Sequence, residues 1–415
     1  MTAASPGMKM YDVIIVGAGP AGLCAALYSS RSRLSTLVLE KAKPGGQAST
    51  TEWLENYPGF PEGVNGPELM ELFAAQAREF GAEIVKDEVV SVSFSPERKA
   101  VRTAQGGEYE ARTVIICPGA EPRTLGLSGE GELRGKGVSY CATCDGDFFT
   151  DLNIVVIGNG DAAVEEGMYL TRFVESATII VVHDEGVLDA TAVIRDRAFR
   201  NSRIKWIWNS VVEEIRGDGI VESVIMRNIR TNERRELETD GVFIFVGTVP
   251  KTDFLRGAVE MDERGYVVTN DLMETSVDGV YCAGDARAKY LHQVITAAAD
   301  GAIAAVAAEK YIHEEEGFRE MVLEPASPVM VCFWSPASQE SLDFMASVES
   351  LAEARAGALE LVKIDVYRNR RIAGRYGIET VPTLAFFRSG KIVHKVEWPT
   401  TEDEVADAAD RAIGK

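Results

Sequence analysis

Long apolar runs are missing from this sequence: no stretch of roughly 18 apolar residues occurs, as a membrane-spanning helix would need. The first ten residues, MTAASPGMKM, also lack the apolar segment of a secretory signal. Basic residues are outnumbered, with 43 Lys and Arg against 64 Asp and Glu, so that the formal net charge is −21. A surface of that charge repels nucleic acid and anionic membranes. We therefore expect a cytoplasmic protein that binds neither nucleic acid nor membrane.

Cysteine and histidine are also scarce, with six and four in 415 residues. Six cysteines are too few for a disulfide framework. Zinc needs four ligands, and no second C-x-x-C or H-x₃₋₅-H motif accompanies CATCDG at 141–146, so we expect no metal site. Cys141 and Cys144 then either staple a loop or carry electrons, and the second interpretation requires an electron source. The scattered cysteines are interpreted as small buried hydrophobes: Cys24, Cys117, Cys282 and Cys332.

A dinucleotide-binding fingerprint follows the first apolar segment, in YDVIIVGAGPAGLCAALYSS. Gly17 allows a tight turn, Gly19 lets the backbone approach a pyrophosphate, and Gly22 permits close packing of a helix on the strand. The helix start supplies free N–H groups to the phosphates. The next strand, STLVLEK, ends at Glu40, 18 residues past Gly22, where a carboxylate accepts hydrogen bonds from ribose hydroxyls.

The same pattern recurs in LNIVVIGNGDAAVEEGMYL, with Gly158, Gly160 and Ala163 at the fingerprint positions, followed by the strand ATIIVVHDE. Two dinucleotide sites and a dithiol favour a flavin, a nicotinamide and a disulfide in series. Further along, DGVYCAGDAR places Gly284 and Asp285 after a strand, as suits an aspartate that reaches FAD. A helix dense in small residues, LHQVITAAADGAIAAVAAEKYI, follows and is typical of tight packing beneath a cofactor.

These motifs, together with PGGQ (44–47), ENYPGFP (55–61), CPGA (117–120) and FVGTVP, resemble the low-molecular-weight thioredoxin reductases over roughly residues 8–320. The resemblance implies an α/β fold of two Rossmann-like three-layer domains, the second inserted in the first. The FAD domain would comprise 8–118 and 249–320, and the nicotinamide domain 121–246, with Gly119 and Gly247-Thr248 at the crossovers. It also implies a homodimer.

The resemblance implies roles for the dithiol as well. Cys144 would lie against the flavin, Cys141 would attack the partner's disulfide, and Asp145 would be the acid/base that handles the thiolate proton. Independently, a C-x-x-C pair at a helix start has a lowered thiolate pKa, and a neighbouring carboxylate can move its proton. The implied FAD contacts are Gly17, Gly19, Pro20, Ala21, Gly22, Glu40, Gly46, Gln47, Asn56, Gly119, Gly284, Asp285, His292 and Gln293. His292 stands where relatives usually have arginine.

The second nucleotide site departs from relatives that use NADPH, which carry an arginine pair after the histidine. Here Asp184 and Glu185 follow His183, at the end of the second strand of that unit. Carboxylates there bind a free 2′-hydroxyl and repel a phosphate, so NADH is favoured over NADPH. The arginines at 195, 197 and 200 have the spacing of a solvated helix face. The alternative is the same dithiol chemistry with reduced ferredoxin or another non-nicotinamide donor, as in a subgroup that has lost nicotinamide use.

Residues 317–328, GFREMVLEPASP, are predicted to be a linker. Residues 328–415 beyond it resemble thioredoxin, with Trp334 near the redox position and the cis-proline loop at Val381-Pro382-Thr383. The two redox cysteines are replaced by Ser338 and Ser341, and serine forms no disulfide. We therefore expect a separate thioredoxin, or a similar small disulfide protein, as the partner. The alternative class is an assembly or sensor protein in which the thioredoxin-like part serves for docking.

Overall fold

The computed structural model describes residues 9–51, 54, 56–95, 98–399 and 401–414. Met8, the first residue of the predicted FAD segment, and Glu55, the first residue of ENYPGFP, lie outside this description. The chain divides into two compact units, Met1–Val306 and Ala307–Lys415. Within the described residues, no helix has the length and apolar character needed to cross a membrane.

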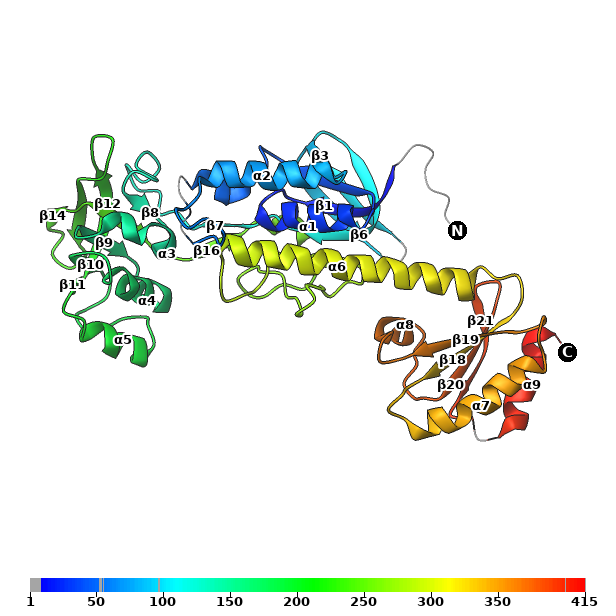
Figure 1. The fold of residues 1–415 in the computed structure, drawn as a ribbon. Helices are drawn as coiled ribbons and strands as arrows, with labels where there is room; N and C mark the ends of the chain where they lie inside the picture. Colours follow the sequence, from blue (N-terminus) through cyan, green and yellow to red (C-terminus); the bar gives the residue numbers. More distant parts are fainter. Residues whose placement is uncertain (1–8, 52–53, 55, 96–97, 400, 415) are drawn as a thin grey trace. The chain divides into compact units, whose positions relative to one another are not determined.

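The first unit contains a sheet with strand order β3-β2-β1-β6-β5-β4, and β17 also pairs with β6 (Figure 1). The strands β1, β2, β3, β6 and β17 pair in parallel, whereas β4 and β5 pair antiparallel to their neighbours. The strands are β1 (Met10–Val16), β2 (Thr36–Glu40), β3 (Glu83–Lys86), β4 (Val89–Phe94), β5 (Lys99–Thr103), β6 (Glu108–Ile116) and β17 (Val280–Cys282). The helical segments are α1 (Pro20–Arg31), η1 (Gly46–Thr50), α2 (Gly66–Glu79), η3 (Asp253–Leu255) and α6 (Val294–Phe318).

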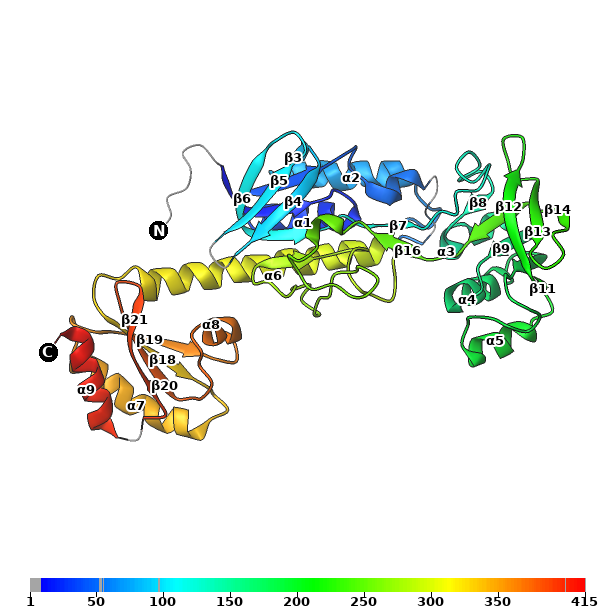
Figure 2. The ribbon, with the colours of Figure 1, turned by 180° about the vertical axis from the view of Figure 1, so that it is seen from behind.

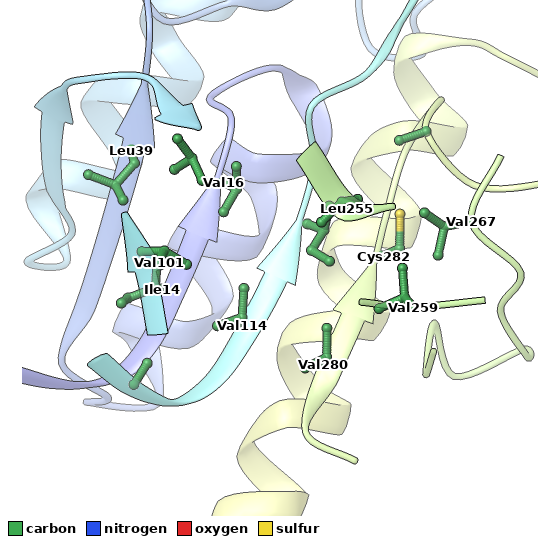
Figure 3. Packing of buried hydrophobic residues seen from close by; sticks show 14 of the residues in the cluster. Ile14, Val16, Leu39, Val101, Val114, Leu255, Val259, Val267, Val280 and Cys282 are labelled. Carbon is green, nitrogen blue, oxygen red and sulfur yellow. The ribbon is translucent and has the colours of Figure 1, made fainter. Parts of the chain in front are cut away.

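The core of this sheet is built from β-branched residues that recur in nearly every strand. In β1, the run Val13–Val16 is buried without interruption, as expected for a parallel strand covered on both faces. Figure 3 shows Ile14, Val114 and Val280 among the side chains of the cluster, which continues through Leu255 to the segment around Val267. The sheet is therefore anchored by sequence segments from both ends of the first unit.

A second sheet of the first unit has the order β11-β10-β9-β15-β8, with every pair parallel. Its strands are β8 (Val138–Ser139), β9 (Asn153–Ile157), β10 (Ser176–Ile180), β11 (Ile204–Ile207) and β15 (Gly241–Ile244). An antiparallel sheet, seen from behind in Figure 2, has the order β12-β13-β14. It consists of β12 (Ser210–Arg216), β13 (Ser223–Asn228) and β14 (Arg234–Glu238). The helical segments are α3 (Ala142–Asp145), η2 (Gly146–Phe149), α4 (Asp161–Leu170) and α5 (Ala192–Phe199).

Two short strands lie where the chain passes between these sheets. They are β7 (Ala120–Pro122) and β16 (Thr248–Pro250), and they pair antiparallel with Val249 opposite Glu121. They follow Gly119 and Gly247 directly, and both glycines have positive φ, 72° and 101°. These glycines allow the chain to turn at the positions where the sequence predicts the crossovers.

The second unit contains a sheet of order β19-β18-β20-β21, in which β18 and β19 are parallel and the other pairs antiparallel. The peptide bond Val381–Pro382 is cis, and Ser338 caps α7 by accepting from the Ser341 N–H. The elements are η4 (Arg319–Leu323), β18 (Val329–Trp334), α7 (Gln339–Glu353), β19 (Glu360–Asp365), α8 (Arg370–Arg375), β20 (Thr383–Arg388), β21 (Lys391–Glu397) and α9 (Glu402–Ile413). Both units are α/β, which confirms the predicted fold class.

The predicted linker at 317–328 is wrong over its first half. Helix α6 continues to Phe318, and residues 319–323 form the π-helical turn η4. Phe318 is 3% exposed and packs against Tyr376 and Phe387, at ring-centroid distances of 5.3 and 6.0 Å. Charge and proline favour a linker here, but Phe318 and Val322 are four residues apart, so they share one helix face and pack into the same core.

Charged groups hold the same helical segment in place. Glu315 accepts hydrogen bonds from Arg371 and Arg375, and Arg371 also lies over the ring of Tyr311, 4.3 Å from its centroid. Burial raises the pKa of Glu315, whereas the hydrogen bonds from these arginines lower it. The net effect is a lowered pKa, so the charged carboxylate is favoured. Residues 307–323 thus belong to the core of the second unit.

We expect Phe318→Ala to destabilise the second unit by about 3–5 kcal/mol, because the substitution leaves a cavity among Tyr376, Phe387 and the sheet. Met321→Ala is the matched control, since that side chain is 53% exposed in the neighbouring turn. Calorimetry of the full chain should show a lower transition temperature for the second unit with the first change only. Equal behaviour of the two variants would restore the linker interpretation.

Candidate functional site

The glycine turn after β1 explains the spacing of the first fingerprint. Gly17 has φ of 98°, and a Cβ built on it would lie 2.3 Å from the Cys117 carbonyl oxygen. A Cβ on Gly22 would lie 1.9 Å from the Gly17 carbonyl oxygen, so that α1 could not pack on this turn. A Cβ on Gly19 would meet only the Gly46 Cα, 3.9 Å away. Gly17 and Gly22 thus serve the fold, whereas Gly19 leaves space at the start of α1.

Glu40 stands at the end of β2, as predicted. Its Oε2 accepts a hydrogen bond from the Ala18 N–H at 2.7 Å, and its Oε1 accepts from the Ala42 N–H at 3.0 Å. The carboxylate is thereby fixed beside the glycine turn. Each carboxylate oxygen has a second lone pair, so Glu40 can still accept hydrogen bonds from ribose hydroxyls.

Two buried polar atoms near Gly284 have no hydrogen-bond partner among the described residues: Asp285 Oδ1 and His292 Nε2. The Lys289 ammonium lies 3.3 Å from Asp285 Oδ1 but not in hydrogen-bonding geometry. Burial lowers the pKa of His292, which favours the neutral imidazole. Buried polar groups normally find a partner. Unpartnered atoms beside a glycine cradle fit a site for a polar cofactor.

Asp300, on α6, is a residue that the sequence interpretation missed. It is 7% exposed, its Oδ2 accepts from the Gly284 N–H at 3.1 Å, and Arg287 and Lys289 lie 3.3 and 3.2 Å from its carboxylate. This network fixes the turn that carries Asp285. The signal was present in the sequence, because Asp300 is the single charged residue among the small and apolar residues of 294–308.

The dithiol of CATCDG is a disulfide in the structure, with Cys141 and Cys144 joined across the single turn of α3. Cys141 is the residue before α3, in an extended conformation. Its Sγ lies 3.5 Å from the Thr143 hydroxyl, which accepts a hydrogen bond from Gln293 Nε2 at 3.2 Å. Gln293 in turn accepts from Asn56 at 3.0 Å. Two predicted FAD contacts are thus connected to the disulfide through Thr143.

Asp145, the predicted acid/base, follows Cys144 directly. Its Oδ2 accepts a hydrogen bond from the Ser139 hydroxyl at 2.6 Å. Burial raises the pKa of Asp145, and the hydrogen bond from Ser139 partly offsets that effect. A carboxyl whose pKa is moved toward neutrality is suited to exchange protons with a thiol.

One cleft of about 3470 Å³ in the first unit brings most predicted site residues together. Those lining it are Gly17, Gly19, Pro20, Ala21, Glu40, Gly46, Gln47, Gly119, Cys141, Cys144, Asp145, Gly284, Asp285, His292 and Gln293. Gly22 and Asn56 do not line it, although Asn56 contacts Gln293. The assignment of these residues to a cofactor stays a prediction.

The second glycine turn lies outside this cleft but has the local geometry of the first. Gly158 has φ of 135°, and a Cβ on it would lie 2.5 Å from the Phe245 carbonyl oxygen and 2.8 Å from the Ala163 Cβ. A Cβ on Gly160 would meet nothing within 4 Å. Gly158 and Ala163 therefore pack the turn, and Gly160 leaves its outer side open.

The acidic pair predicted to select NADH has an unexpected neighbour. Asp184 accepts hydrogen bonds from Arg230 Nη2 at 2.7 and 2.9 Å, whereas Glu185 forms no ion pair within the described residues. Arg230 Nε also donates to Asn209 at 3.2 Å. The three arginines that follow in the sequence do not pair with Asp184 or Glu185. Arg195 pairs with Asp196, and Arg197 and Arg200 are exposed at the end of α5.

The scattered cysteines are mostly core residues, as predicted. Cys117, Cys282 and Cys332 are buried, and burial raises the pKa of Cys282 and of Cys332 to about 12. Cys24 differs in being half-buried, with its pKa raised by burial to about 11. A thiol with such a pKa stays protonated and unreactive near neutral pH.

Comparison with known proteins agrees with this geometry. A family model described as pyridine nucleotide-disulphide oxidoreductase matches residues 11–301, and a thioredoxin model matches residues 309–411. The thioredoxin reductase of Peptoclostridium litorale is 50% identical over 312 residues, covering 74% of this chain and 98% of that protein. The bifunctional thioredoxin reductase/thioredoxin of Mycobacterium leprae is 36% identical over 95% of both chains.

Among solved structures, the thioredoxin reductase from Streptococcus pyogenes matches with a TM-score of 0.70 and 42% identity. The match covers 74% of this chain and 99% of that one. The resemblance stated from the motifs is thus confirmed, and so is the class of disulfide oxidoreductase. The chain belongs to the thioredoxin reductases of the pyridine nucleotide-disulphide oxidoreductase family and carries a thioredoxin-like domain after the reductase part.

Proposed function

We propose that this protein passes electrons from NADH through FAD and the Cys141–Cys144 pair to a separate thioredoxin or a similar small disulfide protein. The observation that carries this proposal is the position of the disulfide. It lines the same cleft as Gly19, Glu40 and Asp285, so that a redox-active dithiol and a nucleotide cradle share one space.

The cradle supports FAD as the resident group. An open position at Gly19, a fixed carboxylate at Glu40 and an Asp285 Oδ1 that accepts no hydrogen bond from the described residues match phosphate, ribose and a further polar part of a dinucleotide. When bound, FAD supplies the relay between a hydride donor and a disulfide. We assign residues 8–118 and 249–320 to the FAD domain and 121–246 to the nicotinamide domain. The last helix of the FAD segment, α6, continues from residue 307 onward into the second unit. The paired crossovers β7 and β16 support this division.

At the dithiol, this chain's own residues carry out the exchange. The sulfur of reduced Cys141 bonds to one sulfur of the partner's disulfide, the partner's S–S bond breaks, and Asp145 takes the proton of the Cys141 thiol. Asp145 returns that proton to the departing thiolate of the partner. The Cys144 sulfur then attacks the Cys141 sulfur, the mixed disulfide breaks, and the proton of the Cys144 thiol goes to the second partner thiolate, so the Cys141–Cys144 disulfide is restored and the partner leaves as a dithiol. Two thiols of this chain are oxidised for one disulfide reduced, so that electrons and protons balance.

The partner is proposed to be a separate protein, because the thioredoxin-like domain, residues 328–415, cannot accept electrons at its own redox position. Ser338 and Ser341 replace the cysteines, and the Ser338 Oγ is engaged as the helix cap of α7. The name of the Mycobacterium leprae relative describes a reductase joined to a thioredoxin. Here we propose docking or assembly as the role of the domain, and a homodimer in the cytoplasm as the working state.

For the nucleotide, Glu185 is the group that favours NADH over NADPH most directly. It forms no ion pair within the described residues, so its charge would face a 2′-phosphate without compensation. Asp184 is partly neutralised by Arg230. Both carboxylates keep lone pairs for a free 2′-hydroxyl. We propose NADH as the donor on this basis.

Replacing either cysteine of the pair should abolish function. We expect Cys141→Ser and Cys144→Ser each to lower thioredoxin reduction by at least about a thousandfold, because neither thiol alone completes the exchange. Cys24→Ala is the matched control and should keep activity, since the half-buried Cys24 thiol stays protonated. A turnover assay with added thioredoxin measures all three. Substantial turnover in either serine variant would contradict the assigned pair.

Reversing the charge at 184 and 185 should change the donor. We expect Asp184→Arg with Glu185→Arg to shift the ratio of kcat/KM for NADPH over NADH upward by about ten- to a hundredfold, because like-charge repulsion becomes attraction. Glu132→Arg with Asp218→Arg gives the same change of net charge at exposed positions and should leave the ratio unchanged. Reduction of the flavin by ferredoxin, with neither nucleotide active, would replace NADH as the proposed donor.

A further inference from the structure

The hydroxyl of Ser139 is the hydrogen-bonding centre of the segment that precedes the disulfide. Ser139 is the last residue of β8, where it lies opposite Phe243 of β15, and it is 5% exposed. Its Oγ donates to Asp145 Oδ2 at 2.6 Å and accepts from the Cys141 N–H at 3.1 Å. One buried atom thus contacts both the attacking cysteine and the carboxylate that takes its proton.

The single proton of this hydroxyl has two acceptors within reach. Asp145 Oδ2 lies at 2.6 Å and the Cys141 carbonyl oxygen at 3.3 Å. A hydroxyl donates one proton, and a hydrogen bond to a carboxylate is shorter and stronger than one to a neutral carbonyl. The proton therefore points to Asp145, and the lone pairs of Oγ remain for the Cys141 N–H.

Other charged groups around Asp145 do not replace this hydrogen bond. Helix α4 packs against α3 and carries Glu165 and Glu166, and burial followed by the charge of Glu165 raises the pKa of Glu166. Asp147 lies on η2. These are carboxyl groups, which oppose ionisation of a neighbouring carboxyl. Among the described residues, no cation forms an ion pair with Asp145, so Ser139 is the group that stabilises its charge.

We propose that Ser139 is a positioning residue for disulfide exchange, whose hydroxyl keeps the Asp145 carboxylate charged and aligned with Cys141. This inference rests on the proposed function, because Asp145 matters only if protons leave Cys141 there. A structural serine would stabilise β8 without affecting how the exchange depends on pH. The pH profile therefore separates the two roles.

The test uses the full-length flavoprotein and the pH dependence of kcat/KM for thioredoxin reduction. The wild-type rate should fall at low pH as Asp145 takes a proton. Ser139→Ala removes a hydrogen bond to the charged form, so the midpoint of this fall should move upward by about one to two pH units. Ser139→Thr keeps a hydroxyl and should keep the wild-type midpoint. Asp145→Asn should remove the fall altogether.

Ser176→Ala is the matched control. Ser176 is also buried in this sheet, on β10, and its hydroxyl donates to Asn153 at 2.6 Å and accepts from Lys205 Nζ at 3.0 Å. The pH midpoint of the low-pH fall in Ser176→Ala should equal that of the wild type. If Ser139→Ala does not fold, Ser139→Gly removes the same hydroxyl and should shift the midpoint equally.

Two results distinguish a failure of the Ser139 role from a failure of the proposed function. If Asp145→Asn loses the low-pH fall but Ser139→Ala keeps the wild-type midpoint, the role of Ser139 is overturned. The role of Asp145 then still stands. A low-pH fall that persists in Asp145→Asn overturns the proton transfer itself. A second readout needs neither donor nor partner: the rate at which iodoacetamide alkylates Cys141 in dithiothreitol-reduced protein, measured against pH. In Ser139→Ala, the low-pH step of this rate should show the same upward shift.

Discussion

Helix α1 is held at atomic contact between two pieces of backbone, and the candidate site depends on that contact. A Cβ on Gly22 would lie 1.9 Å from the Gly17 oxygen, and a Cβ on Gly301 of α6 would lie 2.1 Å from the Ala21 oxygen. No side chain fits at either position. The start of α1 is therefore fixed relative to the β1 turn and to α6, which runs beside it in Figure 1. With it are fixed the helix N–H groups that can receive a phosphate.

A buried ionic network fixes the Gly284–Asp285 turn, as backbone contact fixes the start of α1. Asp300 is surrounded by Arg287 and Lys289 and holds the Gly284 N–H. Burying such charges costs desolvation energy that their attraction only roughly offsets, so the network is weak evidence for stability. Its effect is on geometry, since it fixes the turn that presents Asp285. The turn that carries Asp285 is thus fixed by charged side chains, while Asp285 Oδ1 and His292 Nε2 accept or donate no hydrogen bond among the described residues.

The thioredoxin-like domain keeps its fold although serine replaces both redox cysteines. Ser338 supplies an oxygen that caps α7, and the cis Val381–Pro382 bond remains in the loop that would face a redox site. A serine cap supports a helix without forming a disulfide. The helical segment through Phe318 and Val322 completes the core of this unit. That extension also agrees with the thioredoxin model match, which begins at residue 309 rather than at 328.

The sequence by itself determined the family, the α/β class and the local pairing of Cys141 with Cys144. These follow from local patterns: Gly17, Gly19 and Gly22 stand between an apolar strand segment and a small-residue helix, and Cys141 and Cys144 stand on one turn. The replacement of both redox cysteines in the thioredoxin-like domain was also readable, because it concerns single positions.

Only the tertiary structure decided which polar groups meet. Asn56 and Gln293 are 237 residues apart and share a hydrogen bond, and Arg230 reaches Asp184 from a different sheet, whereas the arginines nearer in sequence do not. Phe318 falls in the predicted linker because its partners, Tyr376 and Phe387, lie far along the chain. Such contacts leave no local pattern, since they depend on how sheets and helices stack. The sequence fixes the spacing along each element, and packing fixes the distances between them.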